Sequence, residues 1–193
     1  MPRLILASES PRRRKLLALL GLPFEAVSHG MEETEETDET PAEMVLRLSK
    51  LKALAVSSRM PDACVIGADT VVDVDGQPLL KPLNRRDAVR MLNVLNGRSH
   101  KVHTGVALAR NSFVVASSVE TTEVVFGDLS EDEILSFVSS GDGDDKAGAY
   151  AIQERGALLV EKIDGCYYNV VGLPVYKLMR LLDKFVPDVF RGP

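Results

Sequence analysis

Basic residues crowd the start of the first predicted helix, at the end where positive charge is least favourable. The segment SESPRRRK covers residues 8–15, in which Ser10 is a good N-cap and Pro11 a good first helical residue. The first turn and the residues just after it hold four cations: Arg12, Arg13, Arg14 and Lys15. A helix N-terminus carries partial positive charge and unpaired N–H groups, so cations there are destabilising. This pattern indicates that an anion binds at this end of the helix.

A lysine is expected on the covered side of a second helix. Thr40-Pro41-Ala42-Glu43 has the sequence of a capping box with proline at the first position, which predicts a helix over 41–58. Its apolar face comprises Met44, Val45, Leu48, Leu51, Ala55 and Val56. At about 100° per residue, Lys52 falls inside this stripe. A lysine there either meets an anion or lies at the edge of the stripe and extends its ammonium to solvent.

An aspartate and a second lysine flank a predicted hairpin. Asp69 follows CVIGA, which is typical of a buried strand, and ligands of α/β folds bind at the carboxyl ends of strands. The alternative is a turn aspartate. Lys81 ends the returning arm of the hairpin, whose turn is Asp75-Gly76, so Lys81 and Asp69 are expected to approach each other. The alternative there is a surface ion pair worth less than about 1 kcal/mol.

Together these residues form a set that suits one chemistry. The cations are Arg12, Arg13, Lys52, Lys81 and, as an open candidate, Lys146. The carboxylates are Asp69 and Glu33, the latter in the acidic loop 32–40. Cations clamp phosphate oxygens and carboxylates hold a divalent metal, so the set predicts a polyphosphate site. Neither a P-loop nor a Rossmann glycine motif occurs. If Arg13 and Lys52 are unfavourable cations, replacing either by alanine should leave thermal stability unchanged or raise it.

Other residues that suggest ligand sites are better explained structurally. His100 and His103 are three apart on a predicted strand and therefore face opposite sides, which argues against a metal pair. The run DGDD at 142–145 lacks the spacing of a calcium loop. Cys64 and Cys166 show no metal-type spacing, and free thiols of a cytoplasmic protein are favoured over one disulfide.

Composition excludes several classes of protein. The chain has 193 residues and a formal net charge of −5, which argues against a general nucleic-acid-binding surface. No apolar run approaches the roughly 18 residues of a membrane span, and the N-terminus does not read as a signal peptide. We therefore expect a cytoplasmic enzyme that acts neither on nucleic acid nor in a membrane.

The order of predicted elements indicates an α/β protein with a mixed sheet. Strands are expected at 4–7, 24–27, 64–67, 70–74, 78–80, 99–109, 113–126, 149–153, 157–163 and 167–171. Helices are expected at 11–20, 41–58, 85–95, 130–138 and 174–185. Neither a linker nor an internal repeat interrupts them, so residues 1–193 are expected to form a single domain.

Several motifs resemble those of a known family. They are SESPRR (8–13) with Leu16 and Leu17, GADT (67–70), Lys81-Pro82, MLNVLNG (91–97), HTG (103–105), DKAGAYAIQ (145–153) and NVVGLP (169–174). In order and over nearly the whole chain, they resemble the Maf family of nucleoside triphosphate pyrophosphatases. The resemblance implies hydrolysis of a nucleoside triphosphate to the monophosphate and pyrophosphate with Mg²⁺ or Mn²⁺. It also implies a strongly bent central sheet flanked by helices, two lobes around a cleft as in inosine triphosphate pyrophosphatases, and often a homodimer.

The resemblance assigns roles to matching residues. Asp69 matches the family's catalytic acid–base aspartate and, with Glu33, the expected metal-binding carboxylates. Glu33, Lys52 and Lys81 match catalytic positions of the cleft. Positions expected to bind substrate are Ser8, Ser10, Arg12, Arg13, Thr70 and Gln153.

One motif points to a branch of the family. KAGAYAIQ (146–153) is similar to the branch associated with dTTP and UTP, in which Arg12, Thr70 and Gln153 match the specificity positions. A glutamine amide both donates and accepts, which suits the O4 and N3–H edge of uracil or thymine. This chain departs from the pattern at GDGDD (141–145), Ala151 and 154–156. The alternatives are a pyrophosphatase for other modified or methylated nucleotides and a nucleotide-sensing module linked to cell division.

Overall fold

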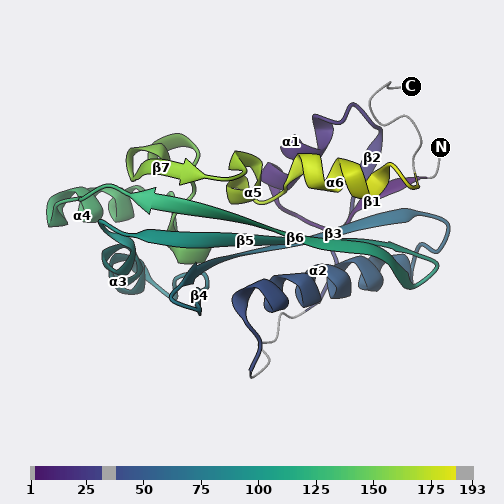
Figure 1. Ribbon diagram of the computed structural model, residues 1–193, viewed down its shortest axis with the longest axis horizontal. Coiled ribbons are helices and arrows are strands. Elements are labelled where there is room, and N and C mark those ends of the chain that lie inside the picture. The colour runs from purple at the N-terminus through teal and green to yellow at the C-terminus, as the bar shows by residue number, and fades with distance from the viewer. Residues whose placement is uncertain (1–2, 32–37, 186–193) are drawn as a thin grey trace.

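A mixed sheet with helices on both faces forms the framework of the protein (Figure 1). The computed structural model describes residues 3–31 and 38–185. The strands in this part of the chain are β1 (Leu4–Leu6), β2 (Phe24–Ala26), β3 (Cys64–Val74), β4 (Gln77–Leu79), β5 (Ser99–Arg110), β6 (Phe113–Phe126) and β7 (Val160–Asp164). Their order is β2-β1-β3-β5-β6-β7, with β4 also paired to β3. β1 is parallel to both of its neighbours, and the other pairs are antiparallel.

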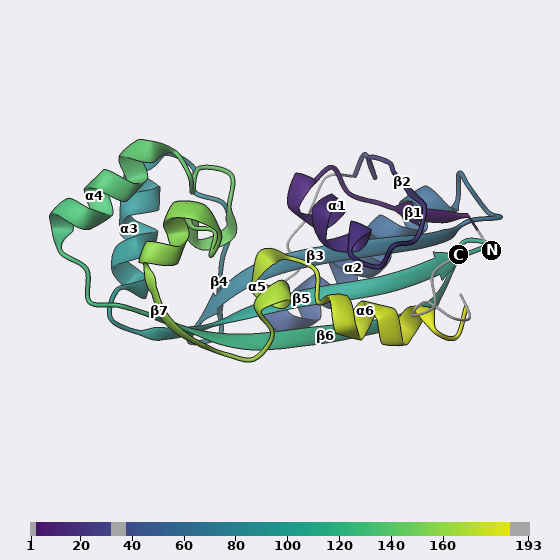
Figure 2. The ribbon, with the colours of Figure 1, turned by 90° about the horizontal axis from the view of Figure 1, so that it is seen from above.

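Helices pack around this sheet in two groups, joined by three long strands. The helices are α1 (Pro11–Ala18), α2 (Pro41–Ser57), α3 (Arg85–Leu95), α4 (Glu131–Ser140), α5 (Tyr167–Val171) and α6 (Val175–Leu182), with 3₁₀ turns η1 (Ala147–Ala149) and η2 (Glu154–Leu158). Seen from above, α3, α4 and β7 gather at one end of the long strands and α1, β1, β2 and α6 at the other (Figure 2). β3, β5 and β6 have 11, 12 and 14 residues and run through both groups. The expected two-lobed α/β architecture is confirmed.

Most predicted helix starts are confirmed by their caps. The side chains of Thr40 and Ser130 each accept a hydrogen bond from the backbone N–H of the third helical residue, a glutamate. The backbone N–H of each cap residue donates in return to the carboxylate of that glutamate, as a capping box requires. Asn84 accepts from the backbone N–H of Asp87 at the start of α3. Ser10 caps α1, with Pro11 as its first residue. The sequence is sufficient to predict these helix starts, because each cap is a contact between residues that are close together in the chain.

Two of the three strands predicted between residues 149 and 171 are wrong, whereas the third, 157–163, overlaps β7 (Val160–Asp164) and begins later than predicted. Residues 149–153 form no strand, and Tyr167–Val171 is a short helix. The aromatic and β-branched residues of YYNVV favour a strand, but tertiary contacts override this propensity. The fully buried Asn169 donates from Nδ2 to the carbonyl of Val102 at 2.9 Å and to Thr122 Oγ1 at 3.0 Å. Those bonds hold the helical turn against β5 and β6.

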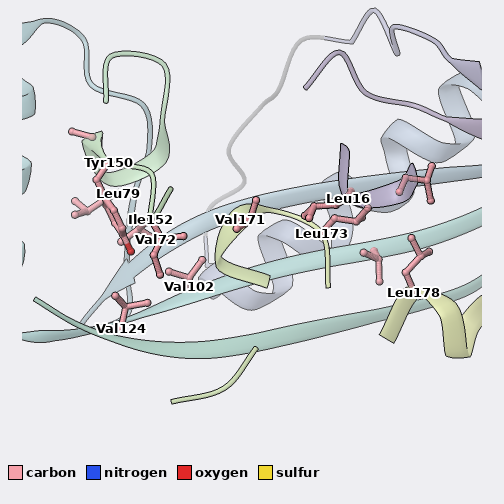
Figure 3. Packing of buried hydrophobic residues seen from close by; sticks show 14 of the residues in the cluster. Leu16, Val72, Leu79, Val102, Val124, Tyr150, Ile152, Val171, Leu173 and Leu178 are labelled. Carbon is pink, nitrogen blue, oxygen red and sulfur yellow. The ribbon is translucent and has the colours of Figure 1, made fainter. Parts of the chain in front are cut away.

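α2 packs unusually close to the sheet because two glycines face it. A Cβ on Gly67 would lie 2.1 Å from the carbonyl oxygen of Ser49, and one on Gly105 would lie 2.2 Å from that of Val45. Any side chain at either position would therefore push α2 away from β3 and β5. On the opposite face, the larger core includes Val72, Val102 and Val124 from three adjacent strands (Figure 3).

Three residue-level expectations have clear outcomes. No helix within residues 3–31 and 38–185 is both long and apolar enough to cross a membrane. Cys64 and Cys166 are free thiols, as expected, and burial raises the pKa of Cys64. His100 and His103 do not form a metal pair, since His100 bonds to Tyr150 and His103 to Asp73 and Thr121.

A buried histidine should make stability depend on pH. Burial of His100 against Phe126 and Tyr150 lowers its pKa from 6.5 to about 4. Below pH 6.5 the His100 side chain is protonated in the unfolded chain, but in the native protein it stays neutral until about pH 4. This residue therefore costs stability as pH falls through that window, up to about 1.4 kcal/mol per pH unit.

We expect His100→Gln, which cannot titrate, to lose less stability than the wild type between pH 6.5 and pH 4. Urea unfolding of both proteins at several pH values measures the difference. Parallel stability curves would contradict a neutral buried His100.

Candidate active site

A cleft of about 1030 Å³ collects nearly all of the site residues predicted from the sequence. Nine of them line it: Ser8, Ser10, Arg12, Arg13, Lys52, Asp69, Thr70, Lys81 and Gln153. They come from α1, α2, β3 and the segments around β4 and η1, which are far apart in sequence. Glu33 lies outside the described residues. The open candidate Lys146 also lines the cleft.

The deepest feature of the cleft is a buried ion pair. Lys52 Nζ donates to Asp69 Oδ1 at 2.5 Å, and the two residues are 3% and 7% exposed. The expectation that Lys52 points to the covered side of α2 is confirmed, and the solvent-extended alternative is wrong. Asp69 lies within β3 rather than at its carboxyl end, because the strand continues to Val74. The close packing of α2 on Gly67 brings the two side chains together.

Arg13 is held by groups from three parts of the chain. Its Nε donates to the carbonyl of Gly172 at 2.9 Å, and its Nη2 donates to Thr70 Oγ1 at 3.0 Å. A weaker contact of 3.5 Å joins Nη1 to Ser8 Oγ. The guanidinium thus has a fixed orientation before any ligand arrives, and its removal would leave hydrogen-bond acceptors unpaired.

A directed chain of hydrogen bonds continues from Arg13 into the core. The buried Thr104 hydroxyl donates to the carbonyl of Asn169 at 3.0 Å. Its single proton is therefore used, so the 2.9 Å bond with Thr70 must have Thr70 as donor. Thr70 in turn accepts from Arg13. Each hydroxyl both donates and accepts, which fixes Thr70 at the wall of the cleft.

The remaining cations repel one another in the substrate-free protein. Burial and the nearby charge of Arg13 lower the pKa of Arg12, which Glu154 partly opposes. Burial, followed by the charges of Arg12 and Lys81, lowers the pKa of Lys146. A bound polyanion would relieve this repulsion. Lys81 shares the cleft with Asp69, but the ion pair described for Asp69 is with Lys52.

Several cleft residues were not predicted from the sequence. The carboxylates Glu9, Asp142, Asp145 and Glu154 line it, as do Tyr150 and His29. The positions of Asp142, Asp145, Tyr150 and Glu154 depend on how residues 141–158 fold over β3, which no local pattern indicates. Tyr150 lies inside the KAGAYAIQ motif, so the motif itself was a signal for it.

The carboxylates of the cleft bear on whether a metal ion can bind there. Within residues 3–31 and 38–185, no group of three or more His, Cys, Asp and Glu side chains is arranged to hold a metal ion. Asp69 supplies one carboxylate among several cations. That donor set fits Mg²⁺ or Mn²⁺ bound with substrate, since such ions commonly use one or two carboxylates plus phosphate oxygens.

Comparisons of sequence give a consistent result. Residues 3–185 match the family described as Maf-like protein. The chain is 48% identical over 192 residues to a dTTP/UTP pyrophosphatase of Symbiobacterium thermophilum, covering 100% of this chain and 98% of the relative. It is 50% identical over 183 residues to a dTTP/UTP pyrophosphatase of Bacillus velezensis, covering 95% and 96%.

Solved structures support the fold. A Ham1 protein of Coxiella burnetii matches with a TM-score of 0.52 at 15% identity, over 95% of this chain and 100% of that chain. The Ham1 protein of Staphylococcus aureus matches with a TM-score of 0.54 at 15% identity, over 94% and 98%. The expected relation to the inosine triphosphate pyrophosphatase fold is confirmed.

The Lys52–Asp69 pair changes an expectation about stability. Replacing Lys52 leaves a buried carboxylate without its ammonium, so Lys52→Met should lower the free energy of unfolding by about 3–5 kcal/mol. This reverses the sequence-based expectation that removing Lys52 is harmless. Urea unfolding at pH 7 measures the loss.

Two variants test the cause of that loss. Lys50→Met, on the same helix and only half-buried, should change stability by less than about 1 kcal/mol. The double variant Lys52→Met/Asp69→Leu should recover most of the loss, because it buries no lone charge. A double variant as unstable as Lys52→Met would show that charge compensation is not the reason.

Proposed function

Because the chain belongs to the Maf-like protein family, we propose that it is a cytoplasmic enzyme that hydrolyses dTTP and UTP to the nucleoside monophosphate and pyrophosphate. The observation that carries this proposal is a cleft that combines a buried Lys52–Asp69 pair, clustered cations and Gln153. Relatives at 44–50% identity over nearly the full chain are dTTP/UTP pyrophosphatases. The free thiols Cys64 and Cys166 suit a reducing compartment.

The cations of the cleft bind the triphosphate. Arg12 and Lys81 both repel Lys146 in the substrate-free protein, and phosphate oxygens bound among these cations relieve that repulsion. Arg13 is oriented in advance by Gly172 and Thr70, so little reorganisation is needed when charge develops on the leaving pyrophosphate.

Asp69 is the proposed general base. A water molecule attacks the α-phosphorus, the bond to the pyrophosphate oxygen breaks, and Asp69 accepts the water's proton. Lys52 orients Asp69, because its ammonium lies 2.5 Å from Oδ1. The monophosphate and pyrophosphate then leave with the charge that the cations had stabilised.

Asp69 is also the proposed carboxylate for Mg²⁺ or Mn²⁺, with Glu33 as the sequence-based candidate for a second. A bound divalent ion would neutralise phosphate charge. Ser8 and Ser10, at the N-terminal end of α1, are proposed to contact the substrate. The homodimer that the family resemblance implies stays a prediction.

Release of pyrophosphate from a panel of triphosphates tests the function. With Mn²⁺ or Mg²⁺, the purified protein should act on dTTP and UTP in preference to CTP, purine and methylated nucleotides. Asp69→Asn should lose at least about a hundredfold in rate, the scale of general base catalysis. It should also lower stability, because the buried Lys52 ammonium loses its counter-charge, so rates are compared below the melting temperature of the variant. A preference for methylated nucleotides would favour the other specificity, and binding without turnover would favour a nucleotide sensor.

Base selection is assigned to Gln153, with Thr70 and Arg12 shaping the pocket. Gln153→Glu replaces an amide donor with an acceptor that faces O4 of uracil or thymine, which is itself an acceptor. We expect a loss of about ten- to a hundredfold in kcat/KM for dTTP and UTP relative to CTP, whose 4-amino group donates. An equal loss for all three nucleotides would contradict base reading by Gln153.

A further inference from the structure

The segment that carries Gln153 is anchored to the sheet by one buried hydrogen bond. Tyr150 Oη lies 2.7 Å from Nε2 of His100, which belongs to β5, and the two residues are 5% and 4% exposed. Their rings also meet edge to face, as do those of Tyr150 and Phe126. Figure 3 shows Tyr150 and Ile152 directed toward the core beside Val72. The side chains of Tyr150 and Ile152 therefore anchor this segment in the protein interior.

The same segment forms a wall of the cleft. Residues 150–153 all line it, and Gln153 is the last of them. The Gln153 side chain does not cap the following turn η2. Its amide therefore remains suited to contact a ligand, whereas the position of its backbone depends on how residues 150–152 are held.

The backbone of this segment is strained at both ends. Ala149 has φ = 60° and Glu154 has φ = 55°, a left-handed conformation that residues with a side chain rarely adopt. Residues 150–153 have no regular secondary structure, so no strand pairing enforces this path. Strained backbone persists only where surrounding contacts determine it. The buried bond between Tyr150 and His100 supplies such a contact.

The hydrogen bond described for the His100 side chain is the one to Tyr150. Nδ1 of His100 is buried and has no hydrogen-bond partner in the described part of the chain. Burial keeps its ring neutral down to a pKa of about 4, so the contact with Tyr150 does not change with pH near neutrality. The bond therefore fixes the distance between β5 and the segment under conditions in which the enzyme works.

From this arrangement we propose that the hydrogen bond between Tyr150 and His100 positions Gln153 for base reading, which makes both of them specificity-determining positioning residues. The inference rests on the proposed function of Gln153. Hydrogen bonds weaken steeply when donor and acceptor are displaced or misaligned, so a small shift of the segment reduces recognition of O4 and N3–H. Arg12 and Arg13 lie on α1 and Lys52 lies on α2, apart from this segment, so these cations are not affected.

The test compares selectivity with stability in a set of variants. Tyr150→Phe removes only the hydroxyl, and His100→Leu removes its partner. Each should lower the ratio of kcat/KM for UTP over CTP by about tenfold, the equivalent of one hydrogen bond to the base. The double variant should lose no more than either single one, since both remove the same bond. The kcat/KM for CTP should stay near the wild-type value.

Two controls separate positioning from general damage. His100→Gln keeps a polar group at about the reach of Nε2 and should retain most of the selectivity. Tyr176→Phe removes a hydroxyl from an exposed tyrosine outside the cleft and should change nothing. Melting temperatures are measured for every variant, because loss of the buried bond lowers stability whether or not it positions Gln153.

The outcomes distinguish this inference from the proposed function. A wild-type protein without preference for UTP over CTP, or insensitive to Gln153→Glu, would overturn the proposed function itself. If the wild type and Gln153→Glu behave as expected but Tyr150→Phe and His100→Leu lower only the melting temperature, the bond is purely structural and the inference is wrong. Lost selectivity in both, rescued in His100→Gln, would establish it.

Discussion

The buried ion pair between Lys52 and Asp69 is the constraint on which the rest of the structure depends. Two charges in the interior are tolerated only when they meet with good geometry, so α2 and β3 must stay in a fixed register. Gly67 permits that register because any side chain there would collide with the carbonyl of Ser49. The helix, the sheet and the chemistry at Asp69 therefore depend on a single close contact.

The other proposed site residues lie on two kinds of structure, regular helices and strands on one side and an irregular segment on the other. The cations proposed to bind phosphate lie on or beside regular elements, and Arg13 is held by a chain of bonds that runs through Thr70 and Thr104. Gln153, the residue proposed to read the base, lies on an irregular segment that Tyr150 anchors to β5 through its hydrogen bond with His100. Substitutions in that segment can shift nucleotide preference without disturbing the site of hydrolysis.

The charges of the cleft also explain why a stable protein carries so many unfavourable residues. Arg12 and Lys146 both have a lowered pKa because burial and neighbouring cations disfavour their charge. Such an arrangement costs stability in the absence of ligand and favours a polyanion when one is present. The strained φ angles of Ala149 and Glu154 also lie at the segment that lines this cleft, and such strain is common at functional sites.

The sequence by itself determined the features that depend on neighbours in the chain. Caps at Thr40 and Ser130 set helix starts, and the hydrophobic stripe of α2 placed Lys52 on the covered side. Its motifs indicated the family and the residues of the cleft. Only the tertiary structure decided that Asp69 is the anion at Lys52, that YYNVV is a helix and that Tyr150 bonds to His100. The physical reason is that these outcomes depend on contacts between residues far apart in sequence, which override local propensity and which no local pattern encodes.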